Sequence, residues 1–160
     1  MLRWLLMQLS DLYLRLGQPA LPQLLTAISM GSLRTYQLFD RLRIRAHLQK
    51  LNAVNLRGAA PKLWARLEAG DQELALDLAQ AILVSHMDMI QAVLDSFGIP
   101  HEEGFFAKDL DAKQYLKDAW IEKAYLEFKE RFQPAVLLFY LNHLNLELFE
   151  GSAEFYAPAA

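Results

Sequence analysis

The fold of this chain is decided by residues 71–100, which read DQELALDLAQAILVSHMDMIQAVLDSFGIP. Apolar and polar side chains recur there with the 3.6-residue period of a half-buried α-helix. Asp71 is of the type that caps a helix N-terminus, and Gly98 is followed by an apolar residue and then Pro100, which is a common helix ending. The pattern predicts one long helix over residues 71–97.

Shorter helical patterns fill most of the remaining chain, and glycines or prolines separate them. The patterns predict further helices over residues 2–16, 22–30, 32–51, 62–69, 111–131 and 134–150. We find no convincing run with the two-residue period of a half-buried strand. We therefore expect an all-α protein, a compact bundle of about six or seven helices around a central helix 71–97.

A chain of 160 residues is long enough to bury a substantial core within one domain. We expect residues 1–151 to form a single helical domain and residues 152–160 to form a C-terminal tail. The apolar faces of the predicted helices place these residues in the core: Trp64, Leu78, Ile82, Leu94, Leu126, Leu137 and Leu141.

The chain has 0 cysteines, which excludes disulfides, thiolate metal sites and cysteine nucleophiles. The two most apolar segments are residues 1–16 and 135–141. Polar residues interrupt the first, and the second is far shorter than the ~18–20 residues that span a bilayer. No Ala-x-Ala site follows the first segment, so a signal peptide is not expected. We expect a cytoplasmic protein with no membrane contact.

Charge is divided unevenly along the chain, although the net charge is only −3. Residues 34–66 carry eight basic side chains and one acidic one, whereas residues 68–130 carry fourteen acids and five lysines. On a helix, Arg34, Arg41 and Arg45 form one stripe that is able to follow the phosphates of a nucleic acid. The negative net charge favours instead a pairing of the basic and acidic segments, within one subunit or between two.

His86 and Ser85 lie beside the apolar stripe of the predicted helix 71–97. A buried imidazole next to a hydroxyl is one way to build a small-molecule site, because burial shifts the imidazole pKa. The alternative is a core histidine whose hydrogen bonds are satisfied. His143 and Glu147 are four residues apart, which predicts a local pair or solvent exposure rather than a metal site.

The stretch HEEGFF at residues 101–106 combines carboxylates with two phenylalanines. Its spacing matches no calcium loop, so we expect no metal there. Phe105 and Phe106 must either fold back onto the core or meet a partner. Phe139 and Tyr140 belong to a helix that is apolar on all sides, and they are the other two candidate interface residues.

The sequence shows no phosphate loop, no serine nucleophile motif and no metal-ligand spacing, so we expect no cofactor and no bound metal. We expect a non-catalytic interaction or oligomerisation protein. We expect it to form a two-fold dimer that buries more than ~1,200 Å² in total, and a further protein partner is also possible. One alternative is a nucleic-acid-binding regulator that uses the arginine stripe. Another is a small-molecule-binding protein or enzyme with a pocket near His86.

Overall fold

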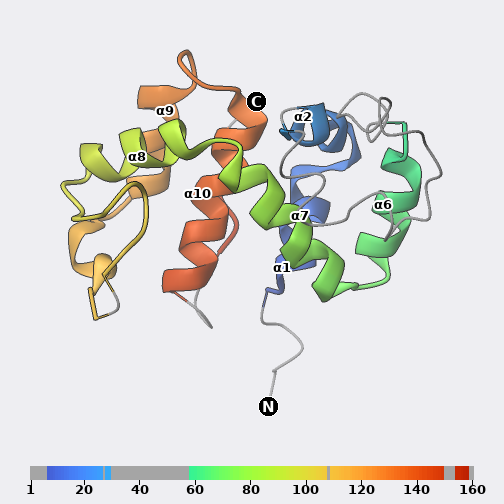
Figure 1. Cartoon of the computed structure of the whole chain (residues 1–160), viewed down its shortest axis with the longest axis horizontal. Helices are drawn as coiled ribbons and strands as arrows, with labels where there is room; N and C mark the ends of the chain where they lie inside the picture. The colour runs from blue at the N-terminus through green and yellow to red at the C-terminus, as the bar shows by residue number, and fades with distance from the viewer. Residues whose placement is uncertain (1–6, 27, 30–57, 108, 150–153, 159–160) are drawn as a thin grey trace. The chain divides into compact units, whose positions relative to one another are not determined.

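The computed structural model describes residues 7–26, 28–29, 58–107, 109–149 and 154–158. These ranges contain seven α-helices, two short 3₁₀ helices and one isolated β-bridge, between Glu102 and Phe105 (Figure 1). The expected all-α class is confirmed. The predicted helix over residues 32–51 lies outside the described residues.

The chain divides into two compact units, residues 8–85 and residues 86–160 with 1–7. A single domain over residues 1–151 stays a prediction.

The described part of the unit 8–85 consists of α1 (Leu9–Leu16), the 3₁₀ helix η2 (Gln18–Ala20), α2 (Leu21–Thr26), α6 (Ala60–Glu68) and α7 (Gln72–Val84). α1 packs against α6 and α7, and α6 also contacts α7 and α2. Leu12, Leu63 and Leu78 are buried in these helices. Tyr13 is buried too, and its hydroxyl donates a hydrogen bond to the carbonyl of Ala75 over 2.8 Å. A buried hydroxyl is costly without such a partner.

α7 begins where the sequence predicts it. Asp71 is the N-cap, and its Oδ1 accepts a hydrogen bond from the backbone N–H of Leu74 at 3.0 Å. This bond satisfies one of the four N–H groups that have no partner within a helix. Arg66 forms an ion pair with the other carboxylate oxygen of Asp71 and so links the end of α6 to the start of α7.

The helix predicted over residues 71–97 is two helices, α7 and α8 (Met87–Ser96), with a turn at Ser85 and His86. Ser85 Oγ donates to the carbonyl of Ala81 at 2.7 Å and accepts from the backbone N–H of Ser29 at 2.9 Å. A serine that bonds back to the preceding turn competes with the helical ladder. His86 then leaves the helical conformation, with φ −132° and ψ 40°, and becomes the N-cap of α8.

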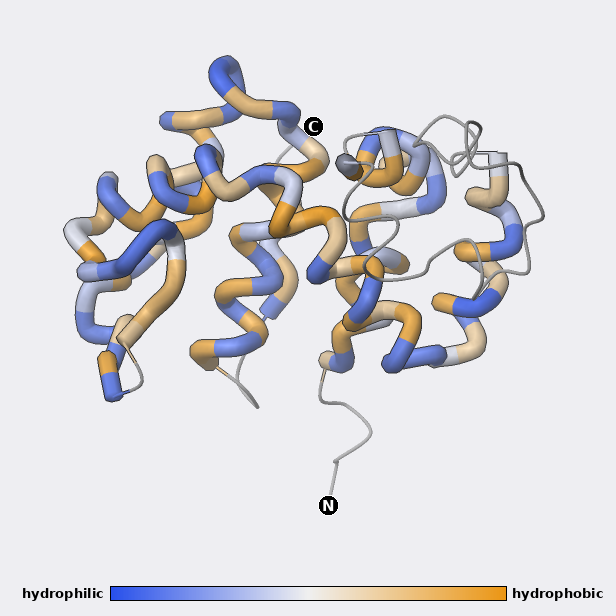
Figure 2. Tube along the Cα trace, in the orientation of Figure 1, coloured by the Kyte–Doolittle hydropathy of each residue, from blue (hydrophilic) through white to orange (hydrophobic). Residues whose placement is uncertain are grey.

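The unit 86–160 contains α8, the 3₁₀ helix η4 (Ala112–Tyr115), α9 (Trp120–Phe128) and α10 (Pro134–Leu148), and α9 packs on α10. Hydrophobic and hydrophilic residues are interspersed along α8 and α9, as expected for half-buried helices, whereas α10 is mostly hydrophobic (Figure 2). The ring of Trp120 meets Phe97 edge-on at 5.8 Å and lies 6.5 Å from the ring of Phe149. None of the helices in the described ranges is long and apolar enough to cross a membrane.

Two helix boundaries in this unit match their sequence signals. Gly98 adopts φ +71°, and the N–H of Ile99 bonds to the carbonyl of Leu94 at 3.0 Å, which is the glycine-terminated helix end expected after residue 97. α10 begins at Pro134, and Gln133 Oε1 accepts from the backbone N–H of Val136 at 3.0 Å. Proline suits the first helical position because its missing N–H is not needed there.

The predicted continuous helix over residues 111–131 is wrong. The 3₁₀ helix η4 ends at Tyr115, and the next residue, Leu116, is extended. Ala119 then adopts the left-handed conformation, with φ +59°, before α9 starts. Asp111 makes no side-chain capping bond at the start of η4. Left-handed backbone at a non-glycine residue interrupts an α-helix.

The expected core is largely confirmed, with two differences. The five expected core residues that are buried are Leu78, Ile82, Leu94, Leu137 and Leu141. Trp64 is half-buried. Leu126 is 55% exposed, so its predicted burial is wrong. α9 buries Trp120, Ile121, Ala124 and Phe128, and Leu126 lies on the opposite side of that helix.

Candidate functional site

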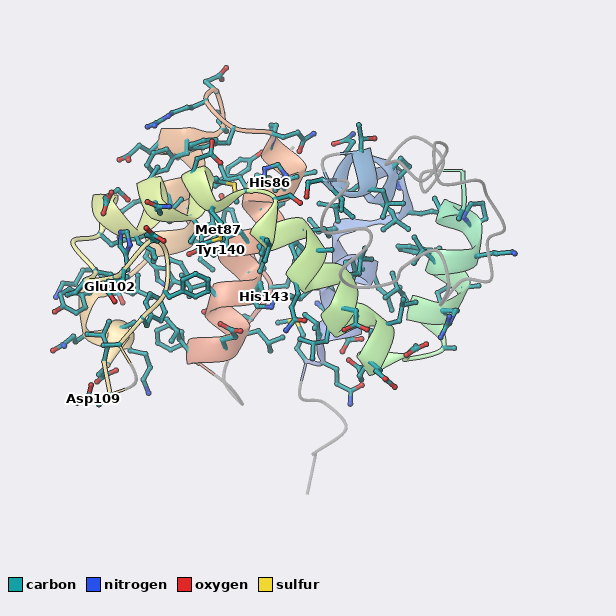
Figure 3. The ribbon with its side chains drawn as sticks, in the orientation of Figure 1. His86, Met87, Glu102, Asp109, Tyr140 and His143 are labelled. Carbon is teal, nitrogen blue, oxygen red and sulfur yellow. The ribbon has the colours of Figure 1, made fainter. Side chains whose placement is uncertain are left out.

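The residues after α8 form a tight two-residue turn. Glu102 and Phe105 exchange both backbone hydrogen bonds, N–H to carbonyl, at 2.9 Å each. The two central residues, Glu103 and Gly104, have φ +52° and φ +94°. Positive φ at both positions is the signature of a type I′ turn. Glu102 is labelled in Figure 3.

His101 fixes this turn to α8. Its Nδ1 accepts a hydrogen bond from the N–H of Gly104 at 2.9 Å, and its Nε2 lies 2.7 Å from Asp95 Oδ1. A ring nitrogen that accepts carries no proton, so the tautomer consistent with both bonds has its proton on Nε2, which donates to Asp95. Both nitrogens of His101 are therefore used in holding the turn.

Gly104 also lies close against α8. An added Cβ would stand 2.5 Å from Met87 Cε and 3.4 Å from Ile90 Cγ2. The positive φ favours glycine here, and any larger residue would also have to push the end of the Met87 side chain aside. The turn is thus held by a hydrogen-bonded histidine on one side and by close packing on the other.

The turn presents Phe105 to solvent. The Phe105 side chain is 66% exposed, whereas Phe106 is half-buried. A surface hollow of about 300 Å³ lies beside the ring, lined by Pro100, His101, Glu102, Phe105, Phe106 and Ala107. An exposed aromatic ring on a fixed backbone is a typical anchor for protein–protein contact. We name residues 101–106 the Phe105 turn.

A second arrangement lies on α10, where Asn142 and Asn145 are buried, with 0% and 8% exposure. Asn142 Oδ1 accepts from the N–H of Tyr156 at 2.8 Å, and Asn142 Nδ2 donates to the carbonyls of Tyr156 at 3.1 Å and of Leu138 at 2.9 Å. Asn145 Nδ2 donates to the carbonyl of Glu154 at 3.0 Å. We call Asn142 and Asn145 the asparagine pair, and residues 154–158 the tail segment.

The structure gives Ser85 a structural role, because its hydroxyl is bonded to Ala81 and Ser29. His86 Nε2 is buried and has no hydrogen-bond partner among the described residues (Figure 3). Burial lowers the pKa of His86, and the carboxylate of Asp88 opposes this shift. A proposed ligand contact at these two residues stays a prediction.

Phe139 and Tyr140, two of the four candidate interface residues, are buried on α10. Burial first, and then the charge of Glu147, raises the pKa of Tyr140. His143 Nδ1 lies 3.8 Å from Glu147 Oε1, so the expected local pair on the last helix is present. Phe105 is therefore the most exposed of the four candidate interface residues.

The remaining sequence candidates are placed as follows. Arg34, Arg41 and Arg45 lie outside the described residues. The carboxylates near the Phe105 turn, Asp109 among them, are exposed (Figure 3). Within the described ranges no three potential ligand side chains come together to hold a metal ion.

Lowering the pH below about 6.5 is expected to reduce the free energy of unfolding. Burial lowers the pKa values of His86 and His143 from 6.5 in the folded state, so the unfolded state binds more protons in that range. The contribution of the two neutral histidines to stability is present above pH 6.5. It is lost as the pH falls towards their pKa values in the folded state. Urea denaturation at pH 7.5 and 5.5 measures the difference, which His86→Gln and His143→Gln should each reduce. An unchanged difference in both variants would contradict this assignment.

Comparison of the chain with known protein families, with characterised proteins and with solved structures gives no match.

Proposed function

We propose that this protein is a non-catalytic helical interaction protein that forms a two-fold dimer through the Phe105 turn. The supporting observation is the exposed ring of Phe105 on a backbone held by the hydrogen bonds of His101 and Glu102. A fixed backbone reduces the conformational entropy lost on binding. A phenylalanine of this exposure supplies a large apolar area to an interface.

The partner we propose is a second copy of the chain. In a two-fold dimer the same patch meets itself, so a ring and a neighbouring hollow on one surface serve both subunits. The hollow of about 300 Å³ beside Phe105 is large enough for one aromatic ring, and its lining includes Pro100 and Phe106. The ring of each copy then enters the hollow of the other.

The charges around the turn set the salt dependence of this contact. Glu102 and Glu103 are exposed beside the ring, so two copies bring like charges together at the rim of the contact. Salt screens such repulsion, with a Debye length of about 10 Å at 0.1 M. Association should therefore strengthen as salt is added.

We place the protein in the cytoplasm, since a chain with 0 cysteines agrees with a reducing compartment.

Replacing Phe105 by serine is expected to weaken self-association by about thirtyfold or more, because truncating an interface anchor costs about 2 kcal/mol or more. Sedimentation equilibrium of both chains over a concentration series gives the two dissociation constants. Leu126→Ser is the matched control, since Leu126 is also an exposed apolar residue of this unit but lies on α9. A wild-type chain that stays monomeric, or two variants that weaken association equally, would refute the proposal.

A further inference from the structure

The ring of His101 joins the Phe105 turn to α8 through both of its nitrogens. Nδ1 accepts the N–H of Gly104 at 2.9 Å, and Nε2 donates to Asp95 Oδ1 at 2.7 Å. The side chain of His101 is only 10% exposed, so water competes little for either bond. Both bonds form together only while the ring is neutral, because a neutral imidazole has one donor and one acceptor.

Protonation of the ring removes the acceptor. Nε2 already carries a proton, so a second proton goes to Nδ1, where it stands against the N–H of Gly104. Two donors then face each other, and the hydrogen bond to the turn is lost. The bond to Asp95 becomes stronger instead, since a charged donor now meets a carboxylate.

The charged groups on the two elements that contact His101 are all acidic. α8 and the Phe105 turn lie within residues 86–107, which contain no lysine and no arginine. The carboxylates in this range are Asp88, Asp95, Glu102 and Glu103, and all four are exposed. No cation of these elements competes with the protonated ring for Asp95, so the ring stays attached to α8.

We propose that His101 holds the Phe105 turn on α8 only while its ring is neutral, so that protonation releases the turn. The turn keeps its own backbone bonds between Glu102 and Phe105 but loses its hydrogen bond to the ring. What then remains is the packing of Gly104 on α8, where the closest atom is the flexible end of Met87. Histidine ordinarily changes its charge between pH 5 and 8, so mild acidification is the signal.

The consequence for association rests on the dimer proposed above, whereas the release itself does not. The backbone below Phe105 is fixed while the His101 bond exists, and a fixed backbone reduces the entropy lost on binding. The apparent affinity falls with the fraction of molecules that hold the binding conformation. Mild acidification should therefore weaken the dimer.

Hydrogen exchange of the Gly104 amide tests the release, measured by NMR from pH 7.5 to 5.0. The chain carries Phe105→Ser, which removes the proposed dimer contact and makes the result independent of it. The reference is the amide of Ile99, which bonds to Leu94 at the end of α8 and reports any general loss of stability. The protection of Gly104 relative to Ile99 should fall about fivefold or more, in step with the ring nitrogen signals of His101.

His101→Asn in the same background is the matched control. The amide oxygen of the new side chain lies close to the place of Nδ1 and accepts the same N–H, but it does not titrate in this range. The protection of Gly104 relative to Ile99 should then be independent of pH. A ratio that stays constant in the chain with His101, or that falls equally in both chains, would overturn the release.

Sedimentation equilibrium of chains with Phe105 intact tests the consequence for the dimer. Between pH 7.5 and 5.0 the dissociation constant of the unmodified chain should rise about threefold or more relative to that of the His101→Asn chain. Carboxylates ordinarily titrate near pH 4, and any effect of theirs is common to the two chains. If the exchange result holds but neither chain associates, the proposed dimer is wrong and the release stands. If both chains associate with the same pH dependence, the predicted weakening of the dimer is refuted.

Discussion

Replacing Leu137 by alanine is expected to lower the free energy of unfolding by about 2–5 kcal/mol. Leu137 lies on α10 with no exposed surface, and its neighbours in the sequence, Val136 and Leu138, are buried as well. Truncation loses the transfer free energy of the removed carbons and leaves a cavity that close-packed surroundings fill only in part. Urea denaturation followed by circular dichroism measures the change.

Leu126→Ala is the matched control for this prediction. It removes the same atoms from the same type of residue in the same unit, but from a side chain that is 55% exposed. Substitutions at such positions change stability by about 0.5 kcal/mol or less. Similar losses in the two variants would mean that α10 is not packed as the structure has it.

Replacing Gly104 by alanine is expected to cost about 1–3 kcal/mol. Part of the cost, about 1–2 kcal/mol, comes from a side chain on left-handed backbone, since Gly104 has φ +94°. The contact with Met87 adds less, because the new Cβ would lie 2.5 Å from Met87 Cε, the far end of a flexible side chain that can move aside. Thermal and urea unfolding both report the loss.

Gly98 separates the two contributions to the Gly104 effect. It also has positive φ, +71°, but an added Cβ would meet nothing within 4 Å. Gly98→Ala therefore isolates the backbone term and is expected to cost about 1–2 kcal/mol. Equal losses would mean that Met87 moves aside at no cost, whereas a loss below about 0.5 kcal/mol in either variant would contradict the positive φ of that glycine.

Helix ends with a local chemical cause were predictable from the sequence. Asp71, Gly98 and Pro134 act within a few residues of themselves, so their neighbours in the chain are enough to identify them. The interruption between α7 and α8 was not predictable in this way. The buried residues Ile82 and Met89 on either side of it are seven residues apart, so the apolar period continues across the break.

The bond that accompanies this interruption joins residues far apart in the chain. The hydroxyl of Ser85 accepts from the N–H of Ser29, a contact between residues 56 positions apart. The wrong prediction that Leu126 is buried has a similar cause, because periodicity within α9 does not say which side of the helix faces α10. Tertiary contacts of this kind override local propensity and pattern.

The candidate site was predictable in part. The two phenylalanines in a polar loop indicated that Phe105 would be exposed or would dock, but the hydrogen bonds of His101 depend on where Gly104 and Asp95 lie in space. The asparagine pair was not predicted, although the sequence carries a signal for it. Two asparagines three residues apart in a strongly apolar helix must find hydrogen-bond partners, and the tail segment supplies them.

The most direct test of the proposed dimer is to observe the ring of Phe105 in contact with another copy. An equal mixture of isotopically labelled and unlabelled chains, examined by filtered nuclear Overhauser spectroscopy, reports only contacts between copies. The proposal predicts intermolecular signals from the Phe105 ring to Pro100 and Ala107, which line the hollow beside it. A dimer whose intermolecular signals all arise from other residues would contradict it, as would a sample with no intermolecular signals at millimolar concentration.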